Sequence, residues 1–280
     1  MKNKIRMPLV GLGALGLALA APGVAMAQSS GTTYQANLQP VPLNGAGGAS
    51  GHLTLTLNGD RATISETVSG LADKLPTDPA TLKAVNIPQK FAGAPYPHVQ
   101  HIHGGAEGVC PTAGADTNHD GVISTTEGIK SYGMIQTTLS VSGSTAPSAG
   151  TDITIAPSGG SFSYHRTITL DSATLQSLKT GKAVIVVHGL NPATAPKASL
   201  TEPNDLNVVL PGETKPVALL ATSPALCGTL TAMPSGGVGT GGGGTAGVQH
   251  EGLIGLGGGL VVLGGLGFGT IAYRRRRSNA

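Results

Sequence analysis

Twelve consecutive residues, 116–127, have the spacing of a calcium-binding loop. Calcium takes roughly six to eight hard oxygen ligands, and loops of this kind supply them from fixed positions around a central glycine. Gly121 stands at the glycine position. The ligand oxygens would come from Asp116, Asn118, Asp120, the Val122 carbonyl, Ser124 through a water molecule, and Glu127. The spacing predicts a structural calcium ion, and the alternative is a surface turn rich in Asp and Asn that binds no metal.

The residues before this loop decide which kind of calcium protein to expect. Residues 104–115 contain Gly, Pro and Cys, which disfavour a helix. Calcium sensors place a helix on each side of the loop. We therefore expect an ion that fixes a long insertion rather than a calcium-driven switch.

A second group of residues that could hold a metal ion consists of histidines. His101 and His103 are separated by one residue, and in a strand this spacing puts both imidazoles on one face. His188 follows the apolar run 183–187, which predicts another strand. Imidazoles that converge from neighbouring strands could bind copper or zinc. Alternatively, the three rings hydrogen-bond to the backbone and bind no metal.

The elements that must position these residues are short strands. Alternating apolar and polar residues, with turn residues between the runs, predict strands at 34–38, 52–57, 62–68, 134–141, 162–170, 183–187 and 226–230. Two short helices are predicted at 80–85, capped by Asp78, and at 173–179, capped by Ser172. This pattern predicts one all-β domain at 31–231, an antiparallel sandwich or barrel with loop insertions and short helices.

The charge distribution argues against nucleic-acid binding. The formal charge is +3, but three of the 17 basic residues lie within 1–6 and four within 274–277. The residues between them carry 10 basic and 14 acidic groups, a balance of −4. A domain that binds nucleic acid through a basic face has the opposite balance.

Both ends of the chain have the composition of export and anchoring segments. Residues 1–27 combine a basic start, an apolar stretch and an Ala-Met-Ala cleavage site, as in a signal peptide; an uncleaved membrane anchor is the alternative. Residues 232–252 are a glycine-rich tether, and 253–273 are an apolar, charge-free span of about 31 Å as a transmembrane helix. The tail 274–280 is basic and is expected to stay cytoplasmic.

These end segments predict a protein held at the cell surface. Together they resemble the cell-wall sorting signals of Gram-positive surface proteins, although the LPxTG pentapeptide is missing. Attachment to the cell wall is therefore an alternative to a retained single-pass membrane anchor. In both cases the body faces outside, where it could meet an extracellular ligand that the sequence does not identify.

Cys110 and Cys227 are the two cysteines of the chain. An even number of cysteines in an exported protein predicts a disulfide. A bridge across a loop of this length would stabilise the fold by about 4–5 kcal/mol in the chain-entropy model. The alternative is a pair of buried thiols.

Six short runs of the sequence resemble the chordin-type (CHRD) domain family in order. They are Tyr34–Leu38 with the following Pro40-Val41-Pro42, Ser50–Leu55, Ser69-Gly70-Leu71, His101–Gly108 and Val186-Val187-His188. The resemblance covers most of 33–231, with insertions at about 72–97 and 109–130. The run His-Ile-His-Gly-Gly is its most specific part.

CHRD domains in turn resemble the copper/zinc superoxide dismutase sandwich, a Greek-key fold. In the dismutases a His-x-His copper pair precedes one bridging cysteine, and the second cysteine begins a late Cys-Gly run. The resemblance implies that His101, His103 and His188 bind copper and that Cys110 pairs with Cys227.

The chain also departs from the dismutase pattern. Pro224 occupies the position of the catalytic arginine, and the zinc and bridging histidines have no clear counterparts. The sequence therefore predicts a surface-anchored, calcium-stabilised binding or structural module. A copper-dependent, dismutase-like redox enzyme is the alternative, and a metal buffer that uses the same histidines is a third hypothesis.

Overall fold

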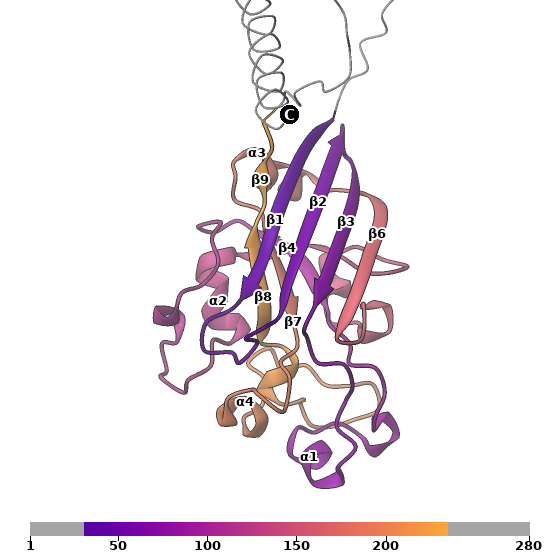
Figure 1. The fold of residues 1–280 in the computed structure, drawn as a ribbon, viewed down its shortest axis with the longest axis vertical. Helices are drawn as coiled ribbons and strands as arrows, with labels where there is room; N and C mark the ends of the chain where they lie inside the picture. The colour runs from indigo at the N-terminus through magenta and orange to yellow at the C-terminus, as the bar shows by residue number, and fades with distance from the viewer. Residues whose placement is uncertain (1–30, 235–280) are drawn as a thin grey trace, which may run out of the picture. The chain divides into compact units, whose positions relative to one another are not determined.

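An antiparallel β-sheet organises residues 31–234, the part of the chain that the computed structural model describes. The strands follow the order β5-β4-β7-β8-β1-β2-β3-β6, and β9 pairs separately with β1 (Figure 1). Their bounds are β1 (Thr32–Pro40), β2 (Ser50–Asn58), β3 (Arg61–Ser69), β4 (Gln100–Gly104), β5 (Met134–Thr138), β6 (Ser161–Thr169), β7 (Val184–His188), β8 (Pro224–Thr229) and β9 (Thr231–Ala232). The predicted all-β, antiparallel class is confirmed.

Several predicted segments lie outside the described residues. They are the signal peptide 1–27, most of the tether 232–252, the transmembrane span 253–273 and the tail 274–280. Within residues 31–234, no helix is both long enough and apolar enough to cross a membrane.

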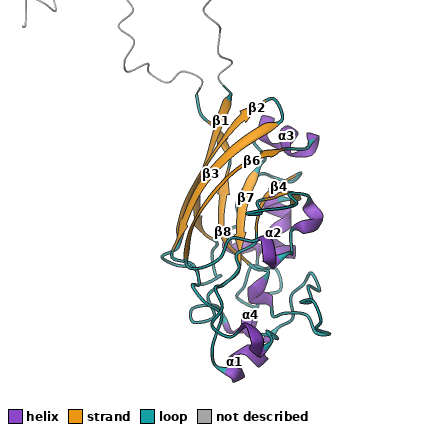
Figure 2. Ribbon diagram, turned by 90° about the vertical axis from the view of Figure 1, so that its right-hand side faces the viewer, coloured by secondary structure: helices purple, strands orange, loops and turns teal. Residues whose placement is uncertain are grey.

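The sheet curls into a half-barrel, so that its two halves form a sandwich-like core (Figure 2). Strand β1 belongs to both halves: Thr32–Leu38 pair with β2, whereas Gln39 and Pro40 pair with β8. Apolar side chains from both halves pack into one cluster, which includes Leu55 and Ile64 on one side and Ile102 and Ile185 on the other. Burial of this apolar surface is the main force that holds the halves together.

The β2–β3 hairpin shows how the sequence produces this arrangement. Gly59 takes a positive φ of 63° in the turn that joins the paired residues Asn58 and Arg61. Inward and outward positions then alternate strictly along β3, as the period of a strand requires. The inward positions carry Ala62, Ile64, Glu66 and Val68.

Glu66 is the exception among these inward positions, because it is polar and only 1% exposed. Neither carboxylate oxygen has a hydrogen-bond partner. Burial raises the pKa of Glu66 to about 8, although the side chain of Gln100 acts to lower it. Tyr164 pairs with Glu66 across β3 and β6, and its hydroxyl also lacks a partner. We call Glu66, Gln100 and Tyr164 the interior cluster.

Short helices fill the connections between strands. The α-helices are α1 (Pro79–Ala84), α2 (Thr125–Tyr132), α3 (Ser172–Lys179) and α4 (Lys197–Thr201). The 3-10 turns are η1 (Gln89–Phe91), η2 (Ala113–Ala115), η3 (Pro147–Ala149), η4 (Ile153–Ile155) and η5 (Leu219–Ala221). Helices α1 and α4 lie at one end of the sheet, and α2 lies beside β4 and β7 (Figure 2).

Two of these helices were predicted and two were not. Asp78 caps α1 as predicted, because its carboxylate accepts the N–H of Thr81 at 2.8 Å. Asp171 rather than Ser172 caps α3, since its carboxylate accepts the N–H of Thr174. Helices α2 and α4 were not predicted. The segment predicted as a strand over 134–141 is shorter, since β5 ends at Thr138.

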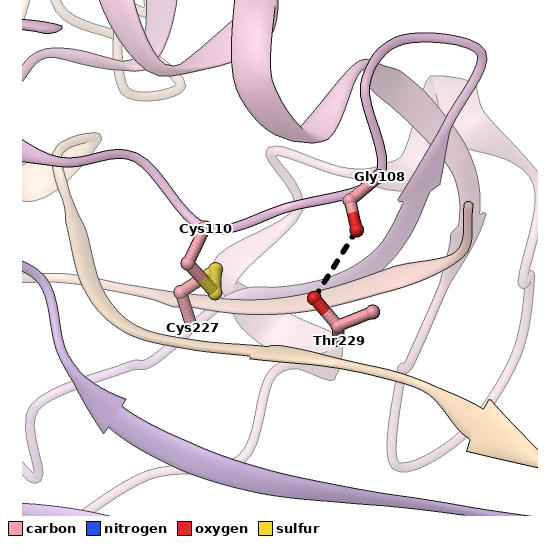
Figure 3. Close-up of a disulfide and its surroundings, with 4 residues drawn as sticks. All are labelled: Gly108, Cys110, Cys227 and Thr229. Atoms are coloured by element: carbon pink, nitrogen blue, oxygen red, sulfur yellow. Dashed lines mark hydrogen bonds between the residues drawn. A yellow bond between two sulfur atoms is a disulfide. The ribbon is translucent and has the colours of Figure 1, made fainter. Parts of the chain in front are cut away.

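Residues 105–133, which we call the covering segment, pack on the outer face of β7 and β8. Ile123 and Tyr132 of this segment form a second apolar cluster with Val184, Val186 and Cys227. A disulfide joins Cys110 to Cys227, with a Cα–Cα distance of 5.7 Å, as predicted (Figure 3). Close to the bridge, the Thr229 hydroxyl donates to the Gly108 carbonyl at 3.1 Å. The covering segment is thus fixed to β8 both covalently and by packing.

Candidate metal centre

Three histidines, His101, His103 and His188, converge beneath the covering segment, and we call them the histidine centre. They are 2%, 1% and 3% exposed. One ring nitrogen from each lies within 4.8 Å of the other two. This confirms the predicted placement of the rings of His101 and His103 on one face, with their centroids 5.5 Å apart.

The pairing of β4 with β7 brings the third histidine to the other two. These strands are antiparallel neighbours in which His101 pairs with Val186. The register slips at Ile102/His103 where β4 pairs with β5, and at Val187/His188 where β7 pairs with β8. Such bulges turn side chains away from the regular pleat. Two of the three histidines therefore lie where the strand geometry changes.

Each imidazole is oriented by one backbone carbonyl. His101 donates from Nε2 to Gly150 at 2.9 Å, and His103 donates from Nδ1 to Gly133 at 2.8 Å. His188 donates from Nδ1 to Thr222 at 2.6 Å. A carbonyl can only accept a hydrogen bond, so each of these nitrogens carries the proton. The lone pairs are consequently on His101 Nδ1, His103 Nε2 and His188 Nε2.

These three unprotonated nitrogens have no hydrogen-bond partner, although they are fully buried. A buried polar atom without a partner costs free energy, so such atoms in folded proteins call for an explanation. A cation between the rings would satisfy all three lone pairs. The residues therefore fit a metal ion, and the carbonyls supply the outer contacts that hold ligating histidines in one tautomer.

The protonation state of the histidine centre also suits a metal ion. Burial lowers the pKa of His103 to about 3 and that of His188 to about 4. Burial lowers the pKa of His101 well below its ordinary value, and the neighbouring rings of His188 and His103 act in the same direction. All three imidazoles are therefore neutral at physiological pH, which is the form that binds metals.

Two glycines are needed to bring carbonyls to the histidine centre. Gly133, which follows α2, has a φ of 90°, and a Cβ atom there would collide with the carbonyl of Gly104. A Cβ atom at Gly150 would lie 2.8 Å from the Ile135 side chain and 3.1 Å from His101 Nε2. A side chain at either position would displace the acceptor. Sequence reasoning did not identify either glycine.

Helix α2 contacts the centre at both of its ends. At its C-terminal end the ring of Tyr132 packs edge-on against His103, with centroids 4.6 Å apart. At its N-terminal end the Thr125 hydroxyl donates to the Thr222 carbonyl, which also accepts from His188. The covering segment thus restrains two of the three histidines.

Two further histidines that lie nearby in the sequence do not join the centre. His98 is fully buried, but its ring nitrogens lie 3.0 Å and 2.9 Å from the carbonyls of His188 and Ala72. A neutral ring carries one proton and therefore donates to one of these carbonyls, and His98 does not belong to the group that could hold a metal ion. His119 is exposed and lies in the loop 116–127 with a φ of 61°.

Pro224, the residue that the sequence comparison placed at the catalytic arginine of the dismutases, has a structural role in this chain. Pro224 begins β8 and its carbonyl accepts from the side chain of Asn44. The arginines within residues 31–234 are Arg61 on β3 and Arg166 on β6. Arg166 donates to the carbonyl of Ser140, so it is already engaged in a loop.

Five of the six predicted calcium ligands lie in the loop that joins η2 to α2, and the sixth, Glu127, belongs to the first turn of α2. Asp116, Val122 and Ser124 are buried, whereas Asn118 is exposed. Asp120 and Glu127 are half-buried. These residues form a region separate from the histidine centre.

An apolar cavity of about 150 Å³ lies near the histidine centre, although none of the three histidines lines it. Its lining includes Tyr96, Pro97, Val99 and Ile153, together with Thr222, whose carbonyl accepts from His188. A cavity of this size and character can admit a benzene-sized apolar molecule.

The histidine centre combines three buried neutral imidazoles, three unpartnered lone pairs and three fixed carbonyl acceptors. Such an arrangement could hold a metal ion through three nitrogen ligands and leave a coordination position open. No model of a known protein family matches the chain, and no curated protein matches it either.

Proposed function

We propose that this protein is an exported metal-binding module in which His101, His103 and His188 hold a copper ion. The observation that carries the proposal is the set of three buried nitrogens without partners, each opposite a nitrogen that donates to a carbonyl. Each ring also hydrogen-bonds to the backbone, as the metal-free alternative predicts, but that alternative gives the three remaining nitrogens no partner.

Ligand chemistry favours copper. Imidazole suits both copper and zinc, but copper(II) binds more tightly than zinc(II) to the same nitrogen ligands. Zinc in a structural site usually has four protein ligands, whereas the centre supplies three. An ion at this centre would therefore retain an open position.

The curled antiparallel sheet supports the proposed relationship to CHRD and dismutase-like sandwiches. Its strands pair antiparallel, and side chains from both halves pack on one apolar core. The Cys110–Cys227 bridge joins the two cysteines whose pairing the resemblance implies.

The same bridge supports export. Disulfides persist in extracellular and periplasmic compartments and are rare where thiols are kept reduced. We infer that the folded module faces the outside, held at the cell surface by the predicted C-terminal span or by attachment to the cell wall.

A copper titration tests the proposed centre. The full chain, purified with its disulfide intact and stripped of metal, should bind one equivalent of copper(II) with the spectroscopic signature of nitrogen ligands. We expect His101→Ala and His188→Ala each to weaken binding by about 100-fold or more, as for other altered metal shells. His165→Ala, which removes an exposed histidine from β6, is the control and should bind like the wild type. Equal binding by His188→Ala would disprove the assignment.

A copper-dependent redox enzyme is the second candidate, favoured by the open position that three protein ligands would leave. In superoxide dismutation, two superoxide ions and two protons give dioxygen and hydrogen peroxide, with one superoxide oxidised and the other reduced. Copper would supply the electron transfer, and the three histidines would hold it. Copper-loaded protein that consumes superoxide, with loss of activity in His188→Ala, would support an enzyme. Inactive copper-loaded protein would leave a binding module.

A further inference from the structure

Residues 116–127, which we call the oxygen loop, fold back on themselves. The carboxylate of Glu127 at the end of the loop accepts the N–H of Thr117 at 2.9 Å and the N–H of Asn118 at 3.3 Å. The beginning and the end of the loop are thereby joined. Gly121, with a φ of 83°, makes the sharp turn between them.

The polar side chains of the oxygen loop are turned toward its own backbone. Asn118 accepts the N–H of Asp120 at 3.0 Å, and Asp120 accepts the N–H of Val122 at 2.8 Å. Asp116 accepts the N–H of Gly121 at 3.1 Å through Oδ2. These bonds hold two carboxylates and an amide oxygen against the backbone of one short segment.

One atom of this loop requires a partner that the chain does not supply. Asp116 is only 8% exposed, and its Oδ1 is buried without a hydrogen-bond partner. The bond from Gly121 to Oδ2 turns the same carboxylate into the loop. A buried carboxylate oxygen with no donor is costly unless a cation lies beside it.

The chemistry of the loop selects the cation. Its ligand atoms are carboxylate, amide, carbonyl and hydroxyl oxygens, which are hard ligands suited to calcium rather than to copper or zinc. The spacing distributes them over six positions in twelve residues, whereas magnesium prefers few protein ligands and keeps several waters.

The oxygen loop leads directly into α2. Ser124 is both a predicted ligand and the N-cap of the helix, and Glu127 completes a capping box with it. An ion held by these two residues would therefore fix the first turn of α2. Thr125 in that turn donates to the carbonyl that also accepts from His188.

We propose that the oxygen loop binds one calcium ion and that this ion fixes the N-terminal turn of α2. The site goes beyond the proposed copper function and does not depend on it, because it uses oxygen atoms from a loop rather than the three histidines.

Calorimetric titration with calcium chloride tests the site. The full chain, oxidised and free of copper, should bind one equivalent with a Kd at or below about 1 mM, the upper end for extracellular calcium modules. Asp116→Asn should raise the Kd by about ten-fold or more, because affinity follows ligand charge. Glu127→Gln should do the same while it keeps a residue that can complete the capping box. If Glu127→Gln also loses affinity, the loss in Asp116→Asn cannot be attributed to misfolding of that one variant.

A matched control is available elsewhere in the chain. Asp152 is an exposed carboxylate that accepts the N–H of Thr154, a local cap outside the oxygen loop. Asp152→Asn should bind calcium like the wild type. Absence of calcium binding by wild-type protein at about 10 mM calcium, well above the weakest module affinities, would overturn the proposal. Equal affinity in Asp116→Asn would also overturn it.

Limited trypsin digestion tests the second half of the proposal. Lys130 is an exposed residue of α2, so cleavage after it reports on opening of the helix. Calcium should slow this cleavage in the wild type and not in Asp116→Asn. An unchanged cleavage rate in calcium-bound protein would refute the fixing of α2. His188→Ala should still bind calcium. This result would show that the calcium site does not depend on the proposed copper centre.

Discussion

Two groups of buried polar side chains lie on opposite faces of β4. His101 and His103 point outward to the histidine centre, whereas Gln100 faces the core with Glu66 and Tyr164, the other members of the interior cluster. Both groups contain buried nitrogen or oxygen atoms without hydrogen-bond partners. They differ in whether protonation can provide the missing hydrogen bonds.

In the interior cluster a proton is enough. The raised pKa of Glu66 keeps its carboxyl neutral at physiological pH, and the neutral group can be both donor and acceptor. In the histidine centre each ring has already used its proton on a carbonyl. A second proton on any ring would place a positive charge in a dry site, which the lowered pKa values oppose. Unpartnered buried atoms therefore indicate a metal site only where all of them are acceptors.

The largest difference between the two groups should appear when metal is added. Copper(II) at about 1,000 times its Kd should raise the free energy of unfolding by about 4 kcal/mol, because the ion binds the folded state. Chemical denaturation with and without copper measures this gain. The variant Glu66→Gln should keep all of it and His103→Ala should lose it. Equal gains in both variants would contradict the conclusion that the histidine centre, and not the interior cluster, binds the metal.

A smaller effect should follow pH through the interior cluster. Between about pH 6.5 and pH 8 the unfolded chain has a charged Glu66 while the folded chain keeps its proton, so stability falls as pH rises. With a folded pKa of about 8, the loss over this interval is on the order of 2 kcal/mol. Glu66→Gln should remove it, as measured by urea unfolding at both pH values.

The acid side of the same profile belongs to the buried histidines, which are the three of the histidine centre and His98. Below about pH 6.5 the unfolded histidines take up protons that the folded ones refuse, so stability falls as pH is lowered. Stability of the copper-free protein should therefore be greatest near pH 6.5. If Glu66→Gln flattened the acid side instead of the alkaline side, the two groups would have been assigned the wrong roles.

The smallest effect should come from Tyr164. Its hydroxyl is buried and makes no hydrogen bond, so Tyr164→Phe should change the free energy of unfolding by less than about 0.5 kcal/mol. Thermal unfolding at neutral pH measures the difference. A loss well above this value would show that the hydroxyl donates a hydrogen bond to Glu66. The interior cluster would then be hydrogen-bonded internally, as the ring nitrogens are to their carbonyls.

The sequence predicted the histidines better than their surroundings. The spacing of His101 and His103 predicted two rings on one face, and the resemblance to the dismutase pattern implied that His188 joins them. The acceptors Gly133, Gly150 and Thr222 could not be predicted, because they act through backbone carbonyls that every residue has. The one sequence feature that could have indicated an acceptor is Gly133, because a glycine often stands where a helix ends.

The fold class was readable, and its details were less so. Alternation predicted most strands, yet it gave no reason for Glu66 to occupy an inward position of β3. Helix α2 was missed because Ser124 and Glu127 were interpreted only as calcium ligands, although Ser-x-x-Glu also marks a helix start. At α3, Asp171 and Ser172 are both good caps, and local geometry chose between them.

Strand β9 has a consequence for how this fold can be rewired. It pairs with the beginning of β1, and the N–H of Met233 donates to the carbonyl of Thr33 at 2.7 Å. The entry and exit points of the described domain are therefore adjacent. A circular permutant joined across these points and opened at the Gly59–Asp60 turn would preserve every strand pairing.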